Sequence, residues 1–235
     1  IGNNFSSLFE DSKGIIWLGT ERGIGYYERK IDKFYSFLDT AKYPKAVCLG
    51  EIGAIVEDEN TNLWLATNFG LIFYDRRSKK FKQISHTPLE TVFIDSRKNI
   101  WLGTSHDGLQ LLDKKTYKTT RYYIKPKGMP EIKNYEVRVI KEDTDGFLWV
   151  GTYGYGLAKF NLNDSSRQTS VIYMHGVKDD NSIGGNLVLS LLLEEEGVWV
   201  GLDNGGISYL TKKSNRFIRY INNPNDAFSI NNNSI

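Results

Sequence analysis

Hydrophobic residues in this chain occur in short runs, separated by polar turns rich in glycine, asparagine and aspartate. Five of these runs have a tryptophan between two apolar residues, followed by a small residue and then by Thr or Leu. They cover residues 16–20, 63–67, 100–104, 148–152 and 198–202, and their tryptophans are 47, 37, 48 and 50 residues apart. A period of 40–50 residues with four short apolar segments per copy is typical of β-propeller blades.

The elements follow one order in every copy. An apolar first strand is followed by an acidic turn, the Trp strand, a short loop into a third strand, and a basic turn into an outer strand. Clear examples are 5–9 and 137–140 for the first strand, 25–27 and 109–112 for the third, and 34–37 and 217–220 for the fourth. The pattern predicts an all-β fold, a β-propeller with five four-stranded blades. The blades cover approximately residues 1–40, 41–87, 88–130, 131–180 and 181–225, and residues 226–235 begin the next blade.

The Trp strands are apolar on both faces, which is typical of a strand covered on both sides by neighbouring sheets. We therefore interpret the five tryptophans as core residues rather than as a binding surface. The small residue two positions after each tryptophan, a glycine except for Ala66, leaves room for the neighbouring sheet to approach closely.

Composition supports a β fold and narrows the function. The chain has six alanines against 22 glycines and 19 asparagines, which disfavours helices and favours tight turns. Its formal net charge of +2 predicts no general affinity for nucleic acid or for an anionic membrane. A single cysteine, Cys48, excludes an internal disulfide framework. The sequence lacks an initial Met, a signal peptide and a membrane-spanning run, and we expect it to be a piece of a longer protein.

Charged residues gather in the turns at one end of the predicted blades. The first-to-second turns are acidic, and the third-to-fourth turns carry Lys and Arg beside the exposed outer edge, where such residues discourage edge pairing. We interpret this pattern as a solvated face. Asp143 and Asp145 resemble the start of a calcium loop, but Phe147 follows in place of further oxygen ligands, so a hairpin turn is expected. The residues indicate no metal site, no cofactor and no catalytic group.

Residues 138–161, RVIKEDTDGFLWVGTYGYGLAKFN, closely resemble the two-component regulator propeller repeat. Its consensus contains an acidic residue and Asp, then Gly, an apolar residue, Trp, a second apolar residue, Gly and Thr, and later Gly-Leu. Copies at 8–28, 55–75, 92–113 and 191–210 match with local losses. The departures are Ala66 for Gly, Leu202 for Thr and a glycine-poor turn at 60–62.

This resemblance implies a place in the periplasmic sensor region of a hybrid two-component system histidine kinase. Such sensors contain tandem seven-bladed propellers, a β-sandwich, a membrane helix and a cytoplasmic kinase, and many respond to oligosaccharides. The implied partners are an oligosaccharide, further blades and a β-sandwich of the same chain, and a second copy of the parent protein. Five blades would then form part of a seven-bladed ring. Propellers of four to eight blades exist, so a closed five-bladed ring is an alternative.

The loops between the second and third strands vary between copies and carry side chains able to bind a ligand. Variable loops on a rigid repeat scaffold are where recognition usually resides. Aromatic, Asp, Asn and His side chains suit a neutral or weakly charged sugar, and an Arg could bind a carboxylate or sulfate. The predicted ligand-binding residues are Arg22, Asn68, Phe69, His106, Asp107, Tyr153, Tyr155, Asp203 and Asn204. A structural or dimerisation propeller without its own ligand, and a carbohydrate-active lyase or hydrolase, are the alternatives.

Overall fold

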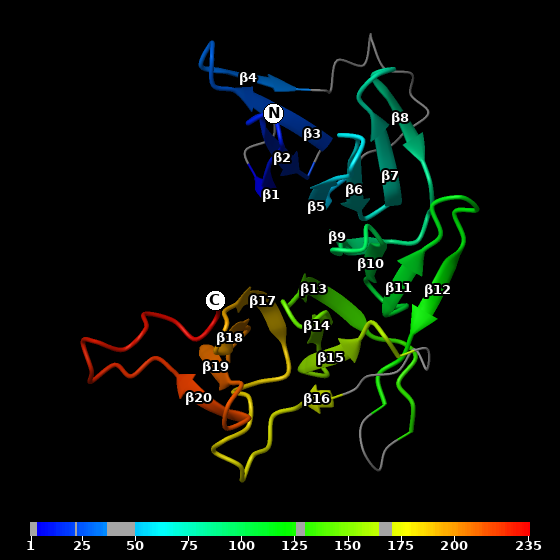
Figure 1. The fold of residues 1–235 in the computed structure, drawn as a ribbon. Helices are drawn as coiled ribbons and strands as arrows, with labels where there is room; N and C mark the ends of the chain where they lie inside the picture. Colours follow the sequence, from blue (N-terminus) through cyan, green and yellow to red (C-terminus); the bar gives the residue numbers. More distant parts are fainter. Residues whose placement is uncertain (1–3, 22, 37–49, 126–129, 165–170) are drawn as a thin grey trace. The chain divides into compact units, whose positions relative to one another are not determined.

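A computed structural model describes residues 4–21, 23–36, 50–125, 130–164 and 171–235. Within these ranges there are 20 strands and no helix, and the strands form five four-stranded antiparallel sheets in which neighbours in sequence are neighbours in the sheet (Figure 1). The predicted all-β propeller fold with five four-stranded blades is therefore confirmed.

The blades are numbered 1 to 5 along the chain, and the first strand of each is called its inner strand. Blade 1 contains β1 (Phe5–Glu10), β2 (Ile16–Thr20), β3 (Gly23–Glu28) and β4 (Lys33–Ser36), and blade 2 contains β5 (Ile52–Glu57), β6 (Leu63–Thr67), β7 (Gly70–Asp75) and β8 (Lys80–Gln83). Blade 3 contains β9 (Leu89–Ile94), β10 (Ile100–Thr104), β11 (Leu109–Leu112) and β12 (Thr119–Tyr122). Blade 4 contains β13 (Glu136–Glu142), β14 (Phe147–Tyr153), β15 (Leu157–Asn161) and β16 (Val171–Tyr173), and blade 5 contains β17 (Val188–Leu193), β18 (Gly197–Leu202), β19 (Ile207–Thr211) and β20 (Arg216–Tyr220).

The chain divides into two compact units, and each is described by itself. Unit 1 comprises Ile1–Thr104 and Gln110–Thr120, and holds blades 1 and 2 with most of blade 3. Unit 2 comprises Ser105–Leu109 and Arg121–Ile235, and holds blades 4 and 5. Within unit 1 the inner strand β5 lies between β1 and β9, and within unit 2 β13 lies beside β17.

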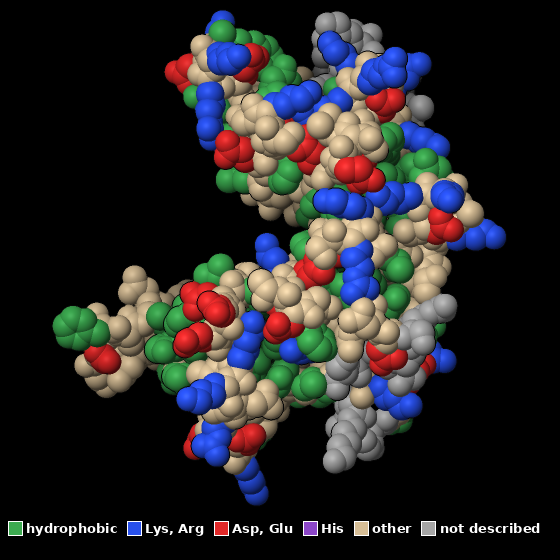
Figure 2. All heavy atoms as spheres, in the orientation of Figure 1, with side chains coloured by type: hydrophobic (Ala, Val, Ile, Leu, Met, Phe, Trp, Pro, Cys, Tyr) green, Lys and Arg blue, Asp and Glu red, His purple; other side chains and the backbone are tan. Residues whose placement is uncertain are grey.

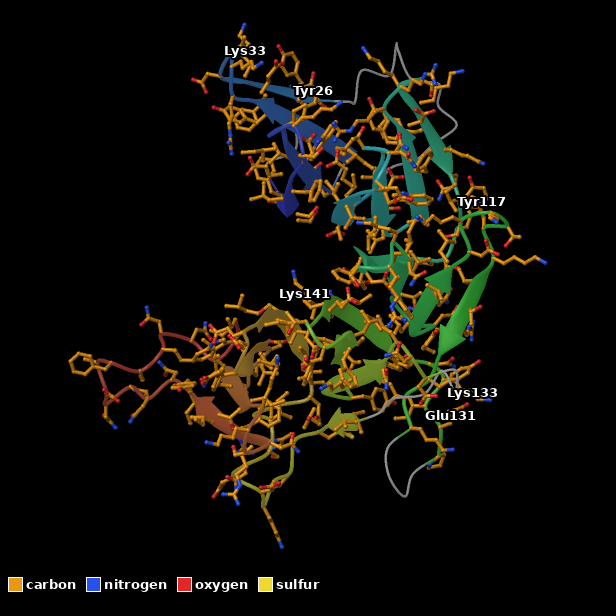
Figure 3. All side chains as sticks on the ribbon, viewed as in Figure 1. Tyr26, Lys33, Tyr117, Glu131, Lys133 and Lys141 are labelled. Carbon is orange, nitrogen blue, oxygen red and sulfur yellow. The ribbon has the colours of Figure 1, made fainter. Side chains whose placement is uncertain are left out.

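The tryptophan of each of three blades packs against the inner strand of the following blade. Because four of the five tryptophans are 1–4% exposed, the interpretation of the Trp strands as core is confirmed. The apolar clusters between blades join Trp17 to Ile52 and Ile55, Trp64 to Leu89 and Val92, and Trp149 to Val188 and Leu191. Tyr26, labelled in Figure 3, extends the first cluster, since its ring centroid is 5.4 Å from that of Trp17 and 4.9 Å from that of Tyr35.

The glycine two residues after the tryptophan allows the blades to stack closely. A Cβ atom at Gly19 would lie 2.7 Å from the carbonyl oxygen of Ile52, and one at Gly151 would lie 2.5 Å from Cγ1 of Val188. Both neighbours belong to the inner strand of the following blade. The predicted close approach is therefore confirmed at these two glycines.

A side-chain hydrogen bond that the sequence analysis missed joins the acidic turn to the Trp strand. In blades 1 to 4, an aspartate six residues before the tryptophan accepts the indole N–H. The donor–acceptor distances are 2.7 Å for Trp17 and Asp11, 3.0 Å for Trp64 and Asp58, 2.8 Å for Trp101 and Asp95, and 2.7 Å for Trp149 and Asp143. Blade 5 departs from the pattern, because Leu193 lies six residues before Trp199, and this tryptophan is only half-buried.

The second carboxylate oxygen of this aspartate holds the turn itself. Oδ1 of Asp143 accepts the backbone N–H groups of Asp145 and Phe147 at 3.1 and 2.9 Å, so the segment is a hairpin turn, as expected. Asp11 and Asp95 make the same bonds in their turns, and all three carboxylates are at most 7% exposed. The expectation of a wholly solvated acidic turn is therefore wrong for these aspartates. Their burial is possible because the indole and turn amides satisfy both oxygens.

The basic turns also reach the acidic residues of the preceding blade. Nη2 of Arg76, in the turn between β7 and β8, lies 2.6 Å from Oδ2 of Asp11 in blade 1 and 3.3 Å from Oε1 of Glu57 in its own blade. The Cζ atom of Arg76 is 5.3 Å from the Trp17 ring centroid. Lys114 of blade 3 pairs with Glu59 of blade 2 at 2.9 Å. On the face seen in Figure 2, charged side chains of both signs are interspersed. Because the Arg76 side chain is only 12% exposed, the expectation of a solvated basic turn is wrong at this residue.

All five inner strands have a β-bulge at the same position relative to the Trp strand. Such a bulge leaves one residue without a directly opposite partner and bends the strand locally. The residues at the bulges are Ser6, Gly53, Glu90, Arg138 and Leu189.

Replacing Trp101 with Ala should lower the free energy of unfolding by ~3–5 kcal/mol, because this removes a large buried aromatic side chain. Urea unfolding followed by circular dichroism measures the change. Lys114→Ala serves as the control and should cost less than about 1 kcal/mol, because its ion pair with Glu59 is partly exposed. Equal losses in the two variants would contradict the assignment of Trp101 to the core.

The Asp11 carboxylate should make the stability of unit 1 sensitive to acid. Burial raises its pKa, but hydrogen bonds from Trp17, Ile15 and Arg76 outweigh burial and hold the pKa below its ordinary value of 3.8. Because the pKa of this carboxyl is lower in the folded state than in the unfolded state, its ionised form stabilises the fold. This stabilisation is complete at pH values above the unfolded-state pKa and is lost as the pH falls through the folded-state pKa. Asp11→Asn should therefore cost ~1–3 kcal/mol at pH 7, through lost charge-assisted hydrogen bonds.

The difference in the free energy of unfolding between the wild-type chain and Asp11→Asn should become smaller as the pH is lowered from about 5 towards 2, because the wild-type carboxylate becomes protonated over that range. Urea unfolding at several pH values measures it. Asp226→Asn, in an exposed turn of unit 2, serves as the control for removing a carboxylate. A difference in stability between the wild-type chain and Asp11→Asn that does not change with pH would refute the assignment.

Candidate functional site

Eight of the nine residues predicted to bind a ligand lie on or beside the loops between the second and third strands, at the opposite end of each sheet from the acidic and basic turns. Six of them belong to unit 2, and Asn68 and Phe69 belong to unit 1. Arg22 lies outside the described residues. The six in unit 2 are His106, Asp107, Tyr153, Tyr155, Asp203 and Asn204.

The two predicted residues of unit 1 have different surroundings. Oδ1 of Asn68 accepts the backbone N–H of Glu51 at 3.1 Å, and its backbone N–H donates to the Glu51 carbonyl at the same distance. Asn68 therefore ties its loop to the residue before β5. The ring of Phe69, in contrast, is 47% exposed and stays accessible to a ligand.

Tyr153 and Asp203, from adjacent blades of unit 2, are brought together. The hydroxyl of Tyr153, at the end of β14, donates to Oδ2 of Asp203 at 3.4 Å. The other carboxylate oxygen of Asp203 accepts the Ser234 hydroxyl at 2.8 Å. Asp203 therefore links the loop after β14 to the segment that follows blade 5.

The loop after Tyr153 depends on its glycines. Gly154 and Gly156 have φ angles of +118° and +69°, a region in which most side chains are strained. Their backbone N–H groups both donate to the carbonyl of Asn186, at 2.9 and 3.0 Å. These bonds hold the loop in a tight turn, and Tyr155 beside it is half-buried.

Two charged residues beside Tyr153 were missed in the sequence analysis. The guanidinium carbon of Arg138 lies 5.1 Å from the Tyr153 ring centroid, and Arg138 Nε pairs with the carboxylate of Glu136. Arg138 therefore covers one face of the Tyr153 ring. The sequence feature that could have identified Arg138 is its charge within the otherwise apolar residues 137–140. The structure places Arg138 at the bulge of β13.

Asp107 is joined to the same inner strand. It forms an ion pair with Arg121 at 2.9 Å, and it bridges to Tyr135, the residue directly before β13. The buried Tyr135 hydroxyl donates to the Tyr122 carbonyl at 2.6 Å, and burial raises its pKa, so it acts as a neutral donor. The neighbouring His106 is exposed.

The cluster around Tyr153 is suited to hydrogen bonding with hydroxyl groups. It contains the carboxylates of Asp203 and Glu136 and the guanidinium of Arg138, beside an aromatic ring that is 37% exposed. Carboxylates accept hydrogen bonds from hydroxyl groups, and an aromatic face packs against the apolar face of a sugar. The formal charge of the three groups is −1, which favours a neutral ligand over an anion. Over the described residues, no group of three His, Cys, Asp or Glu side chains is placed to hold a metal ion.

The fold and repeat together define a β-propeller whose blades carry a recurrent Asp-to-Trp motif. The sequence model of the two-component regulator propeller family matches residues 1–22 and 131–154, the segments that contain Trp17 and Trp149. These two segments match the two-component regulator propeller repeat, which confirms the resemblance noted from the sequence. Among curated proteins, none matches the sequence.

Solved structures with the same fold are distant in sequence. An auxiliary nutrient binding protein from Bacteroides thetaiotaomicron VPI-5482 is 11% identical with a TM-score of 0.64, covering 93% of this chain and 57% of its own. The β-propeller domain of Cps50 (Swd1) from Myceliophteria thermophila is 14% identical with a TM-score of 0.64, covering 98% of this chain and 70% of its own.

A third structure is the extracellular domain of BT4673 from B. thetaiotaomicron, assigned to a hybrid two-component system. It is 18% identical with a TM-score of 0.54, and 92% of this chain corresponds to only 37% of that domain. At these identities the likeness establishes the propeller fold. In the described ranges, no helix has the length and hydropathy required to cross a bilayer.

Proposed function

We propose that this propeller is a periplasmic ligand-sensing module of a hybrid two-component signalling protein, and that it recognises an oligosaccharide released from a polysaccharide. The observation that carries the proposal is the contact of Tyr153 with Asp203 across two blades, which places an aromatic ring and a carboxylate side by side on variable loops. The two-component regulator propeller repeats support the signalling context. Structural similarity to a nutrient-binding propeller supports the idea that this fold presents such a surface.

The ligand would contact the uncovered part of the Tyr153 ring, because Arg138 lies over one of its faces. Hydroxyl groups of the sugar would donate to Asp203 and Glu136, and Tyr155 and Asn204 would border the site. His106 and Asp107 would extend it along the loop of blade 3. Asn68 and Phe69 of unit 1, and Arg22, which lies outside the described residues, stay separate predicted ligand contacts.

In this proposal the module binds and does not catalyse, and the signal passes to other parts of the parent protein. Those parts would be further blades, a β-sandwich, a membrane helix and a histidine kinase, with the parent acting as a homodimer. Asp203 of blade 5 bonds to Tyr153 of blade 4 and to Ser234. A ligand bound at these loops would therefore change how rigidly blades 4 and 5 are held together.

A structural propeller without its own ligand is the second candidate. The observation that favours it is that Asn68, Asp107, Tyr153 and Asp203 all have partners within the chain. In that case these side chains would stiffen the loops, and ligand recognition would reside elsewhere in the parent protein.

A glycan array probed with the 235-residue chain distinguishes the two candidates. Tyr153→Ala combined with Tyr155→Ala should weaken binding to the recognised glycan at least tenfold, about 1.4 kcal/mol, because the aromatic surface is removed. Tyr117→Ala is the matched control: Tyr117, labelled in Figure 3, is also 37% exposed but lies in the turn between β11 and β12.

The thermal midpoint of each variant shows whether the fold is intact. Unchanged affinity in a normally folded double variant would place the site away from Tyr153. The wild-type chain binding no glycan would favour the structural role. Glycan cleavage, detected by mass spectrometry, would instead indicate an enzyme.

A further inference from the structure

One segment of unit 2 supports both loops of the candidate site. It comprises residues 174–187, runs from β16 to β17 and is called the linker (Figure 1). Near its end, the carbonyl of Asn186 accepts the N–H groups of Gly154 and Gly156 at 2.9 and 3.0 Å. These two glycines belong to the loop that follows Tyr153, so the linker provides the acceptor on which that loop rests.

The next residue of the linker, Leu187, reaches both loops. It forms an antiparallel bridge with Tyr153, and its carbonyl accepts the N–H of Asp203 at 2.9 Å. The linker and the second loop also pack backbone against backbone, since a Cβ atom on Gly184 would lie 2.8 Å from the carbonyl oxygen of Gly205. The linker is therefore the common backbone support of the two side chains that the site brings together.

The bonds within the loop after Tyr153 do not replace this support. Thr152 donates from its hydroxyl and its backbone N–H to the carbonyl of Gly156, and its hydroxyl oxygen accepts the N–H of Tyr155. These bonds shape the loop internally, but they do not fix it relative to Asp203. Both glycines of the loop have positive φ angles, and glycine loses more conformational freedom on ordering than any other residue. The order of the loop therefore depends on the position of the Asn186 carbonyl.

Blade 5 holds the middle of the linker in place. Arg219 of β20 donates from Nε to the carbonyl of Ser182 at 2.8 Å, and the hydroxyl of Ser208 in β19 accepts the N–H of Gly184 at 3.0 Å. Ile183, between these contacts, is fully buried in the core of blades 4 and 5. The linker is therefore anchored independently of the two loops that it supports.

The side chain of Asn186 joins the two ends of the linker. Its Oδ1 accepts the N–H of His175 at 2.7 Å, so residues 175–186 close into an Ω-loop. Over the described residues, Nδ2 of Asn186 makes no hydrogen bond. The side-chain oxygen is therefore the atom that fixes Asn186, and with it the carbonyl that both glycines share.

We propose that Asn186 is a positioning residue of the ligand site. Through its side-chain oxygen it holds the end of the linker, and through the linker it keeps Tyr153 and Asp203 in the arrangement that binds a glycan. A loop that is ordered before binding loses less conformational entropy when the ligand arrives, so this order raises the affinity. The effect of Asn186 on affinity rests on the proposed function, whereas its effect on the order of the loop does not.

Two variants of the 235-residue chain test the order of the loop. Asn186→Ala removes the bond to His175, and Asn186→Asp keeps an oxygen acceptor at the same place and loses only Nδ2. Hydrogen exchange of the Gly154 and Gly156 amides, measured by NMR on glycine-labelled protein, should be about fivefold faster in Asn186→Ala, the factor for one lost neutral hydrogen bond. In Asn186→Asp both amides should exchange as in the wild-type chain.

Asn62→Ala is the matched control. Oδ1 of Asn62 likewise accepts one backbone N–H, that of Arg76 at 3.2 Å, but this bond lies in unit 1. Its removal should leave the exchange of Gly154 and Gly156 unchanged. An equal increase in Asn62→Ala would show a general loss of stability and would overturn the role of Asn186.

The glycan array is the probe for affinity, read as the concentration of chain that gives half-maximal binding. This concentration should rise about fivefold in Asn186→Ala, mainly through faster dissociation, and should stay unchanged in Asn186→Asp and Asn62→Ala. Unchanged glycine exchange in Asn186→Ala, or equally fast exchange in Asn186→Asp, would overturn the proposal. So would an unchanged array midpoint in Asn186→Ala despite faster exchange, because the order of the loop would then not determine affinity. A wild-type chain that binds nothing on the array would refute the proposed function, and the exchange rates would still decide whether Asn186 orders the loop.

Discussion

The hydrogen bond from the tryptophan indole to the aspartate six residues earlier is the interaction on which the stacking of the blades depends. A buried carboxylate is costly unless its oxygens are satisfied, and here the indole takes one oxygen while turn amides take the other. The bond fixes the orientation of the indole within its own sheet. The ring is thereby held against the inner strand of the next blade, as Trp149 is against Val188.

The sequence was sufficient to predict the repeat, the four-stranded blades, the tryptophan core and the close approach at glycine. These features are local, because the spacing of apolar residues and turn signals within one copy already determines them. The burial of Asp11 was not predictable in the same way. Its carboxylate looks like any other acid in a polar turn, and one of its partners, Arg76, lies 65 residues away and reaches it only through the stacking of two blades.

The candidate site was predictable to a similar degree. The varied loops after the Trp strands indicated Tyr153 and Asp203 as surface groups, and the fold places them in contact. Arg138 was missed because strict alternation along a strand does not hold at a bulge, so its place over the Tyr153 ring could not be inferred from the pattern of β13. Asn68 shows the converse, since a polar loop residue proved to bond the backbone of its own blade.

The repeated bulge has a consequence for how such a protein diversifies. Each inner strand contains one residue released from pairing with the Trp strand, between neighbours that hold the stack together. The five blades place serine, glycine, glutamate, arginine and leucine there. Gly53 is constrained, because a side chain at that position would collide with the Glu90 carbonyl, but the other four are chemically unrelated. The repeat thus carries chemically different side chains at one position of the inner strand, while the aspartate, tryptophan and glycine positions that hold the stack stay nearly the same from blade to blade.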